Sequence, residues 1–178
     1  AEAPGPRATK LTVPASEVSA PAAAYIEVDG ARLEPGRARA ELATDEMEVS
    51  WDLEFESAAE AFHHLPYSFL YKAPLPRTKF LSPYPDARYS GTVMVDGERI
   101  ELDGWPGMIG HNWGAEHAER WVWVQGAGFA GRSPEDYFDM AVGRIKVAGR
   151  TTPWVGNGML VLDGAEHRLG GFERVPST

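Results

Sequence analysis

The chain contains no cysteine, which excludes a disulfide framework, a thiolate metal site and a cysteine nucleophile. It also lacks any cluster of Lys or Arg, and its 17 basic and 26 acidic residues give a formal net charge of −9. Such an acidic chain is a poor match for nucleic acid or for an anionic membrane surface. Since no apolar run approaches the roughly 18 residues of a membrane-spanning helix, no integral membrane segment is predicted. A cytoplasmic location is the default expectation.

Helical periodicity is also scarce, because 14 Pro and 19 Gly interrupt every candidate window. Only single helical turns are expected, over residues 57–63 and 115–120. Strand patterns are present instead. Polar and apolar residues alternate from Glu48 to Glu56, and Asp96-Gly97 separates two apolar runs as in a tight hairpin. The pattern predicts an all-β fold, an antiparallel barrel or sandwich of about seven to nine strands.

The predicted organisation has three parts. Residues 1–23 are expected to be an irregular N-terminal segment and residues 24–150 a β-barrel domain. Residues 151–178 are expected to form terminal strands or the start of a second barrel. The Pro-rich stretch 66–85 is predicted to be too broken for a regular strand and to pack across the sheet. Because the sequence begins at Ala1 rather than Met, we expect it to be a segment of a longer chain.

Tryptophan is in excess, and four of the six lie close together in the sequence: Trp105, Trp113, Trp121 and Trp123. At strand spacing Trp121, Trp123 and Gln125 share one face, and His111 shares a face with Trp113. The run 121–125 is apolar on both faces apart from Gln125, which predicts a central strand or a cavity wall. Polar groups on an aromatic wall are typical of a small-molecule pocket. The candidate binding residues are Asn112, Trp113, Arg120, Trp121, Trp123 and Gln125. The alternative is structural packing, with Arg120 stacked on an indole ring and paired with an acidic neighbour.

A second feature is the pair Tyr137 and Asp139, which point the same way along a predicted strand. A carboxyl group on the wall of an apolar cavity has a raised pKa and can donate a proton near neutral pH. Indole faces nearby would stabilise the cation formed when an alkene is protonated. The alternative is that Asp139 is a solvated strand residue.

Other chemistries find little support in the sequence. His111, Glu116 and His117 do not have the spacing of a helical zinc site, so neither a metal nor a cofactor is expected. The His63-His64 pair is predicted to be a surface or packing feature. No nucleophile elbow and no phosphate-binding glycine loop occurs.

Two stretches resemble a known family. Residues 110–114 read Gly-His-Asn-Trp-Gly and residues 120–125 read Arg-Trp-Val-Trp-Val-Gln. Together they are similar to the central motif of the lipocalin-like superfamily that includes carotenoid 1,2-hydratases, tocopherol-cyclase-like proteins and Diels–Alderases. The resemblance covers about residues 51–162 and implies an antiparallel lipocalin-like barrel, often one of two in a longer chain. It implies Asp139 as the acid that protonates a C=C bond, with Tyr137 and His111 orienting it or activating water. Trp113 would face the carbocation.

The expected function is cofactor-independent hydration or cyclisation of a C=C bond in a hydrophobic isoprenoid or polyketide-like substrate. Three alternatives stay open: a pericyclic cyclase that only folds a polyene, a carrier of a hydrophobic ligand without catalysis, and an interaction domain whose barrel is filled by its own side chains. The expected partner is a hydrophobic small molecule. The sequence does not indicate an oligomeric state.

Overall fold

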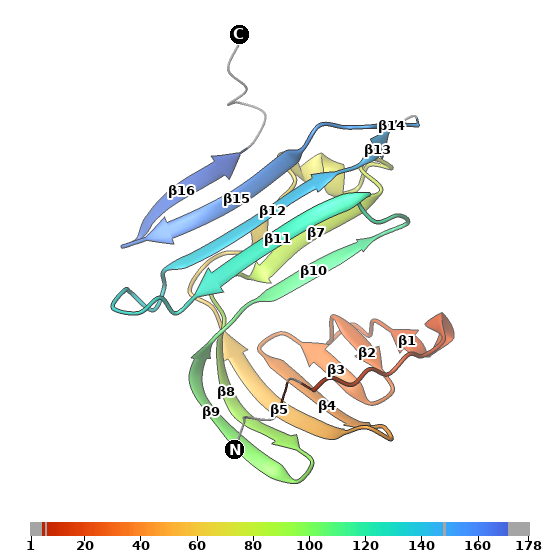
Figure 1. Cartoon of the computed structure of the whole chain (residues 1–178), viewed down its shortest axis with the longest axis vertical. Coiled ribbons are helices and arrows are strands. Elements are labelled where there is room, and N and C mark those ends of the chain that lie inside the picture. The colour runs from red at the N-terminus through yellow and green to blue at the C-terminus, as the bar shows by residue number, and fades with distance from the viewer. Residues whose placement is uncertain (1–4, 6, 148, 171–178) are drawn as a thin grey trace. The chain divides into compact units, whose positions relative to one another are not determined.

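The computed structural model describes residues 5, 7–147 and 149–170, and its regular structure is strand apart from two short 3₁₀ turns, η1 (Ala15–Glu17) and η2 (Ser68–Tyr71) (Figure 1). The chain divides into two compact units. Unit 1 comprises Ala1–Glu56 and Tyr89–Trp105, and unit 2 comprises Ser57–Arg88 and Pro106–Thr178. The prediction of an antiparallel all-β chain is confirmed.

Unit 1 is built on one sheet with the order β1-β2-β3-β4-β5-β8-β9. Its strands are β1 (Val18–Ser19), β2 (Ile26–Val28), β3 (Ala31–Glu34), β4 (Arg37–Ala43), β5 (Glu48–Glu56), β8 (Arg88–Val95) and β9 (Glu98–Pro106). Strand β5 matches the alternating segment of the sequence, with Phe55 buried and Glu54 and Glu56 exposed. The N-terminal segment is tied to this unit by Arg7, which donates hydrogen bonds to Asp96 and to the Glu46 carbonyl.

The dipeptide Asp-Gly occurs four times in the sequence, and three of the four pairs form hairpin turns. Asp96 and Gly97 have φ values of 49° and 83°, so both adopt the left-handed conformation that a two-residue hairpin between β8 and β9 requires. Two further Asp-Gly pairs behave in the same way, at residues 29–30 and 163–164. Asp103-Gly104 differs, because it lies inside β9, where the Gly104 N–H donates to the Ser90 hydroxyl.

Unit 2 contains two larger sheets and one small one. The first sheet has the order β10-β7-β6, the second β11-β12-β15-β16, and β13 pairs with β14. Their strands are β6 (Phe62–His63), β7 (Thr78–Tyr84), β10 (Ile109–Gly114), β11 (Arg120–Ala127), β12 (Tyr137–Arg144), β13 (Lys146–Val147), β14 (Arg150–Thr151), β15 (Val155–Leu162) and β16 (Ala165–Gly170). Phe62 from the first sheet and Tyr137 and Met159 from the second form the apolar core.

Several predictions about elements are wrong. Residues 57–63 and 115–120 form no helical turn. The stretch 66–85 does contain a strand, β7, because its prolines leave residues 78–81 free to pair with β10. Strand β11 is not central: it ends its sheet, and Trp121 is 64% exposed. The N-terminal segment 1–23 includes η1 and β1.

Other predictions remain untested. Within the described residues each sheet has two ends and none closes into a barrel. The predicted bounds of a barrel domain at residues 24 and 150 stay a prediction. Within the predicted terminal segment 151–178, strand β15 pairs with β12 and strand β16 pairs with β15, so both belong to the same sheet as β12. Residues 171–178 lie outside the described residues. Among the described residues no helix is long and apolar enough to cross a membrane.

Candidate functional site

The two larger sheets of unit 2 contact each other through one face of β7. Ser82 stands opposite Phe62, and Phe80 opposite Asn112, so these residues share a face. His64 follows β6 and stacks on the Phe80 ring with 4.2 Å between ring centroids. Phe80 in turn meets the Trp123 ring of β11 edge to face, at 5.6 Å. This face of β7 therefore forms an aromatic layer against the β11-β12 sheet.

Asp139 of β12 lies against that layer and is fully buried. Its Oδ1 accepts a hydrogen bond of 2.9 Å from the indole N–H of Trp123. Its Oδ2 lies 3.3 Å from Nε2 of His64, an imidazole whose side chain is only 4% exposed. The same Nε2 is hydrogen-bonded to the Ser82 hydroxyl at 3.1 Å. We call His64, Ser82, Trp123 and Asp139 the polar cluster.

The polar cluster keeps Asp139 ionised. Burial raises the pKa of its carboxyl group, but the polar side chains of His64, Ser82 and Trp123 stabilise the carboxylate more strongly, so the net pKa lies below its ordinary value. The expectation of a raised pKa at Asp139 is therefore wrong. The physical reason is that the surroundings of the carboxyl group are polar as well as buried, which alternation along a single strand does not reveal.

Three polar atoms at this site are buried and accept or donate no hydrogen bond among the described residues: Nδ1 of His64, Oδ2 of Asp139 and Nε2 of Gln125. Gln125 stands directly opposite Asp139 in the β11-β12 register, so the two side chains share a face. Buried polar atoms are usually paired with protein or with ordered water. Since Oδ2 of Asp139 faces Nε2 of His64, the atoms left without a polar neighbour at this site are Nδ1 of His64 and Nε2 of Gln125.

Tyr137 lies two residues before Asp139 and is also buried, as the alternation predicts. Burial raises the pKa of its phenol to about 12, with smaller contributions from the carboxylates of Glu166, Asp86 and Asp139. Tyr137 is thus a neutral phenol at physiological pH. It can donate a proton in a hydrogen bond but cannot serve as a base.

The predicted pair His111 and Trp113 does lie on one face of β10, but not the face that meets Asp139. Both stand opposite residues of β7 that point away from the polar cluster, Leu81 and Lys79. The His111 and Trp113 rings stack at 4.8 Å, and Trp113 also stacks on Tyr71 at 5.9 Å. The structure therefore separates His111 and Trp113 from Asp139, whereas Asn112 shares the face of Phe80.

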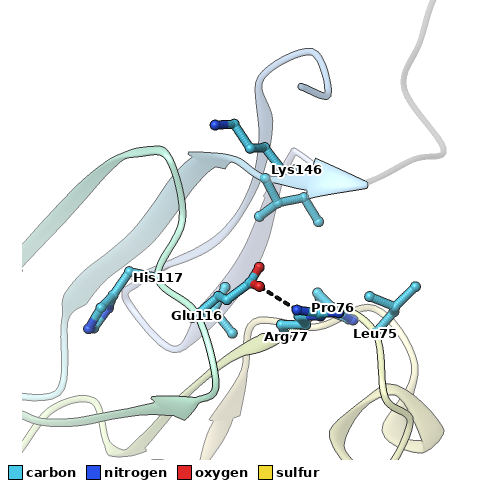
Figure 2. Close-up of a pocket in the computed structure, with 8 residues that line it drawn as sticks. Leu75, Pro76, Arg77, Glu116, His117 and Lys146 are labelled. Atoms are coloured by element: carbon cyan, nitrogen blue, oxygen red, sulfur yellow. Dashed lines mark hydrogen bonds and ion pairs between the residues drawn. The ribbon is translucent and has the colours of Figure 1, made fainter. Parts of the chain in front are cut away.

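The remaining predicted binding residues divide in the same way. Trp123 belongs to the polar cluster, and Gln125 lies opposite Asp139. Arg120 and Trp121 are exposed at the start of β11. Glu116, weighed above as a metal ligand, forms an ion pair with Arg77 (Figure 2). Among the described residues no group of three or more His, Cys, Asp or Glu side chains is placed to hold a metal ion.

Two clefts stand out among the described residues, and Asp139 lines neither of them. The cleft in Figure 2, between the Arg77–Glu116 pair and Lys146, has a volume of only about 10 Å³, room for about one water molecule. A larger cleft of about 240 Å³ lies in unit 1. It is lined mainly by apolar residues of the N-terminal segment and of β2 to β5, including Leu11, Val13, Val28, Leu42 and Trp51.

Sequence reasoning missed His64 and Ser82. A signal for His64 was available, because Phe62 and His64 are two residues apart and a buried Phe62 predicts a buried His64 on an extended chain. Ser82 lies in the Pro-rich stretch, where no strand was predicted. The His63-His64 pair is accordingly divided: His64 is buried in the polar cluster, and His63 is exposed and packs on Tyr71.

Chemically, the polar cluster is a buried carboxylate in contact with an imidazole. Such a pair can hold a proton on the imidazole and keep the carboxylate as its counter-ion. The rings of Phe62 and Phe80 pack on this imidazole, Phe80 with its face, and aromatic faces attract a cation. The arrangement suits proton transfer to an apolar group.

The comparison with known proteins gives distant relatives. The chain is 26% identical over 111 residues to the uncharacterized protein Rv0493c of Mycobacterium tuberculosis strain H37Rv, and equally to the uncharacterized protein MT0513 of strain CDC 1551. The match covers 62% of this chain and 32% of each relative, so it spans about a third of the length of these curated relatives. No family model matches the chain, and no solved structure matches it.

Proposed function

We propose that the polar cluster is the acid–base centre of a cofactor-independent enzyme that hydrates or cyclises a C=C bond in a hydrophobic isoprenoid or polyketide-like substrate. The observation that carries the proposal is the fully buried Asp139 carboxylate, 3.3 Å from the imidazole of His64 and hydrogen-bonded to Trp123. In this proposal the two sheets that meet across Asp139 are walls of a lipocalin-like barrel.

Burying a carboxylate against an imidazole is costly to the fold, which supports a role beyond packing. Taking a charged group out of water costs several kcal/mol, and apolar residues of similar volume are often at least as stabilising. Unit 2 nevertheless buries His64, Ser82 and Asp139 beside its apolar core. Buried groups of this kind are more common at functional sites than elsewhere.

The low pKa of Asp139 revises the roles of the residues. In this proposal His64 donates the proton from its imidazolium form, and Asp139, 3.3 Å away, is the counter-ion that holds it in place. The proton moves from the imidazolium to one alkene carbon, which leaves a carbocation on the other carbon and a neutral imidazole. Water then adds to the cation and returns its proton to His64, or a second C=C bond adds and a proton is lost to His64. Both routes balance without an oxidant or a cofactor.

The test uses an acyclic isoprenoid alkene, squalene, with the purified chain in H₂¹⁸O and separately in D₂O. Hydration raises the product mass by one labelled water, and cyclisation gives an isomer that takes up one deuterium. We expect Asp139→Asn and His64→Gln to lose at least 100-fold in turnover, the low end of what a general acid contributes.

The matched control is His63→Gln, because His63 is adjacent but exposed. It should keep the turnover of the unaltered chain. Full activity in both Asp139→Asn and His64→Gln would remove the cluster from the mechanism. An unlabelled isomer that still forms in Asp139→Asn would indicate a pericyclic reaction instead.

A second candidate function is the binding of a hydrophobic ligand without catalysis, and the unit 1 cleft favours it. Its volume of about 240 Å³ and its apolar lining suit a small apolar molecule. This function predicts that a bound alkene quenches tryptophan fluorescence, since Trp51 lines the cleft, and is recovered unchanged. Trp51→Phe should remove the quenching while Asp139→Asn leaves it intact.

A further inference from the structure

The unit 1 cleft has two walls of different origin. One wall is a face of strands β2 to β5, with Val28 and Trp51. The other is the N-terminal segment 7–13, red in Figure 1, which contributes Leu11 and Val13 and pairs with no strand among the described residues. We propose that segment 7–13 is a strap, which closes over an apolar ligand in the cleft and controls how fast that ligand leaves. The inference rests on the ligand-binding function proposed for this cleft.

Weak side-chain contacts hold the strap at its first residues. Arg7 donates to the Asp96 carboxylate, at 2.5 Å, and to the Glu46 carbonyl, at 2.7 Å. The hydroxyl groups of Thr9 and Thr44 are hydrogen-bonded at 2.7 Å. The Arg7 and Asp96 side chains are 54% and 39% exposed, and exposed ion pairs contribute little to stability. Since the strap runs on into η1 and β1, and β1 pairs with β2, the strap opens at the Arg7 contacts, which we call the latch.

The size and lining of the cleft indicate what the strap covers. An engineered apolar cavity of about 150 Å³ binds benzene, so the volume of about 240 Å³ suits a larger apolar molecule, such as two fused rings. The charged residues of the lining, Lys10, Asp29 and Glu41, are exposed and of both signs, so they favour no charged ligand. Leu11 lines the cleft and is still 46% exposed. An apolar ligand would bury more of it, which favours the closed strap.

The first experiment locks the strap. Because the chain has no cysteine, Thr9→Cys with Thr44→Cys can form only one disulfide within the chain, where the two hydroxyls now meet. The probe is 1-naphthylamine, an uncharged two-ring dye whose fluorescence changes in apolar surroundings, and its dissociation is followed by stopped-flow dilution. In the oxidised variant the dissociation rate should fall by about tenfold or more, and dithiothreitol should reverse the fall. Thr44→Cys alone is the matched control, whose rate dithiothreitol should leave unchanged.

The second experiment releases the strap. Arg7→Ala removes the latch and should raise the dissociation rate of 1-naphthylamine about two- to fivefold, the range that an exposed ion pair contributes. Arg99→Ala is the matched control, because its exposed ion pair with Glu101 lies within strand β9 and not in the strap. It should leave the rate unchanged.

A third readout needs no ligand and separates the strap from the binding function. Trp51 lines the same cleft as the strap, and its share of the fluorescence is the difference between each chain and the same chain carrying Trp51→Phe. Acrylamide quenching of this share should fall in the oxidised disulfide variant and rise in Arg7→Ala. If the unaltered chain does not bind 1-naphthylamine, the binding function is wrong and acrylamide alone decides on the strap. Quenching that is equal in the locked, unlatched and unaltered chains overturns the strap, as do equal dissociation rates of bound dye.

Discussion

Replacing Asp139 by Asn tests whether a buried charge holds the polar cluster together. Asn keeps an oxygen for the Trp123 indole N–H, 2.9 Å away, but puts an amide nitrogen in place of the oxygen 3.3 Å from Nε2 of His64. The variant thus keeps a neutral hydrogen bond and loses the charge contact. We expect Asp139→Asn to lower the free energy of unfolding at pH 7 by about 1–3 kcal/mol. Asp139→Ala also leaves the indole N–H unpaired and should cost about 3–5 kcal/mol.

The effect should depend on pH with a defined sign. Because the folded-state pKa of Asp139 is lowered by the net effect of burial and of His64, Ser82 and Trp123, the carboxylate contributes stability above its unfolded pKa of about 3.9. That contribution is lost as the pH falls through the folded pKa. The destabilisation by Asp139→Asn should therefore be full at pH 7 and shrink below about pH 4.

The assay is urea unfolding followed by tryptophan fluorescence, at pH 7 and at a series of acidic pH values. At this chain length each kcal/mol lost corresponds to about 2–4 °C in Tm, which gives an independent check by calorimetry. Equal stability of Asp139→Asn and the unaltered chain at pH 7 would refute the reasoning. A gap between them that widens in acid would refute the sign of the pKa shift.

Three further predictions address neighbouring features. Gly114→Ala should destabilise the chain by about 2 kcal/mol or more in urea unfolding, because Gly114 has φ +139° and a Cβ there would lie 1.9 Å from the Arg77 carbonyl oxygen. Gly110→Ala is its control and should change stability little, since its nearest new contact is 3.4 Å. Tyr137→Phe should remove a phenol that ionises near pH 12 in a spectrophotometric titration, because burial raises the pKa of Tyr137 to about 12; it should also reduce the stability lost between about pH 10 and pH 12. His64→Ala leaves the Asp139 charge without its imidazole and should cost about 3–5 kcal/mol at pH 7, whereas His63→Ala, at an exposed position, should cost under about 1 kcal/mol.

Local sequence patterns predict a strand well where one face of the strand is exposed to solvent and the other is buried. The nine residues of β5 and the β8-β9 hairpin could be delimited because alternation and the Asp-Gly turn are properties of neighbouring residues. The same reasoning placed Tyr137 and Asp139 on one buried face. Such patterns carry no information on strand order. For that reason the run 121–125, apolar on both faces, predicts a central strand or a cavity wall, whereas β11 lies at the edge of its sheet.

The partners of Asp139 could not be predicted, because they come from distant parts of the chain. His64 and Ser82 lie 75 and 57 residues before Asp139, and they reach it only because β6 and β7 pack on the β11-β12 sheet. The pKa of a carboxyl group depends on such partners as much as on burial. Likewise, His111 and Trp113 share a face as predicted, but only the register with β7 shows that this face is turned away from Asp139.

The ionisation of Asp139 decides most directly between the two mechanisms, in which either the carboxyl group or the His64 imidazolium donates the proton. It can be measured by following the ¹³C resonance of the Asp139 side-chain carboxyl group by NMR as the pH is lowered from 8 to 2, with Asp139→Asn used to assign the signal. The polar cluster predicts a single carboxylate resonance down to about pH 4 and a midpoint below the ordinary value of about 3.9. A midpoint near pH 6 or higher would contradict it and would make Asp139 itself the proton donor.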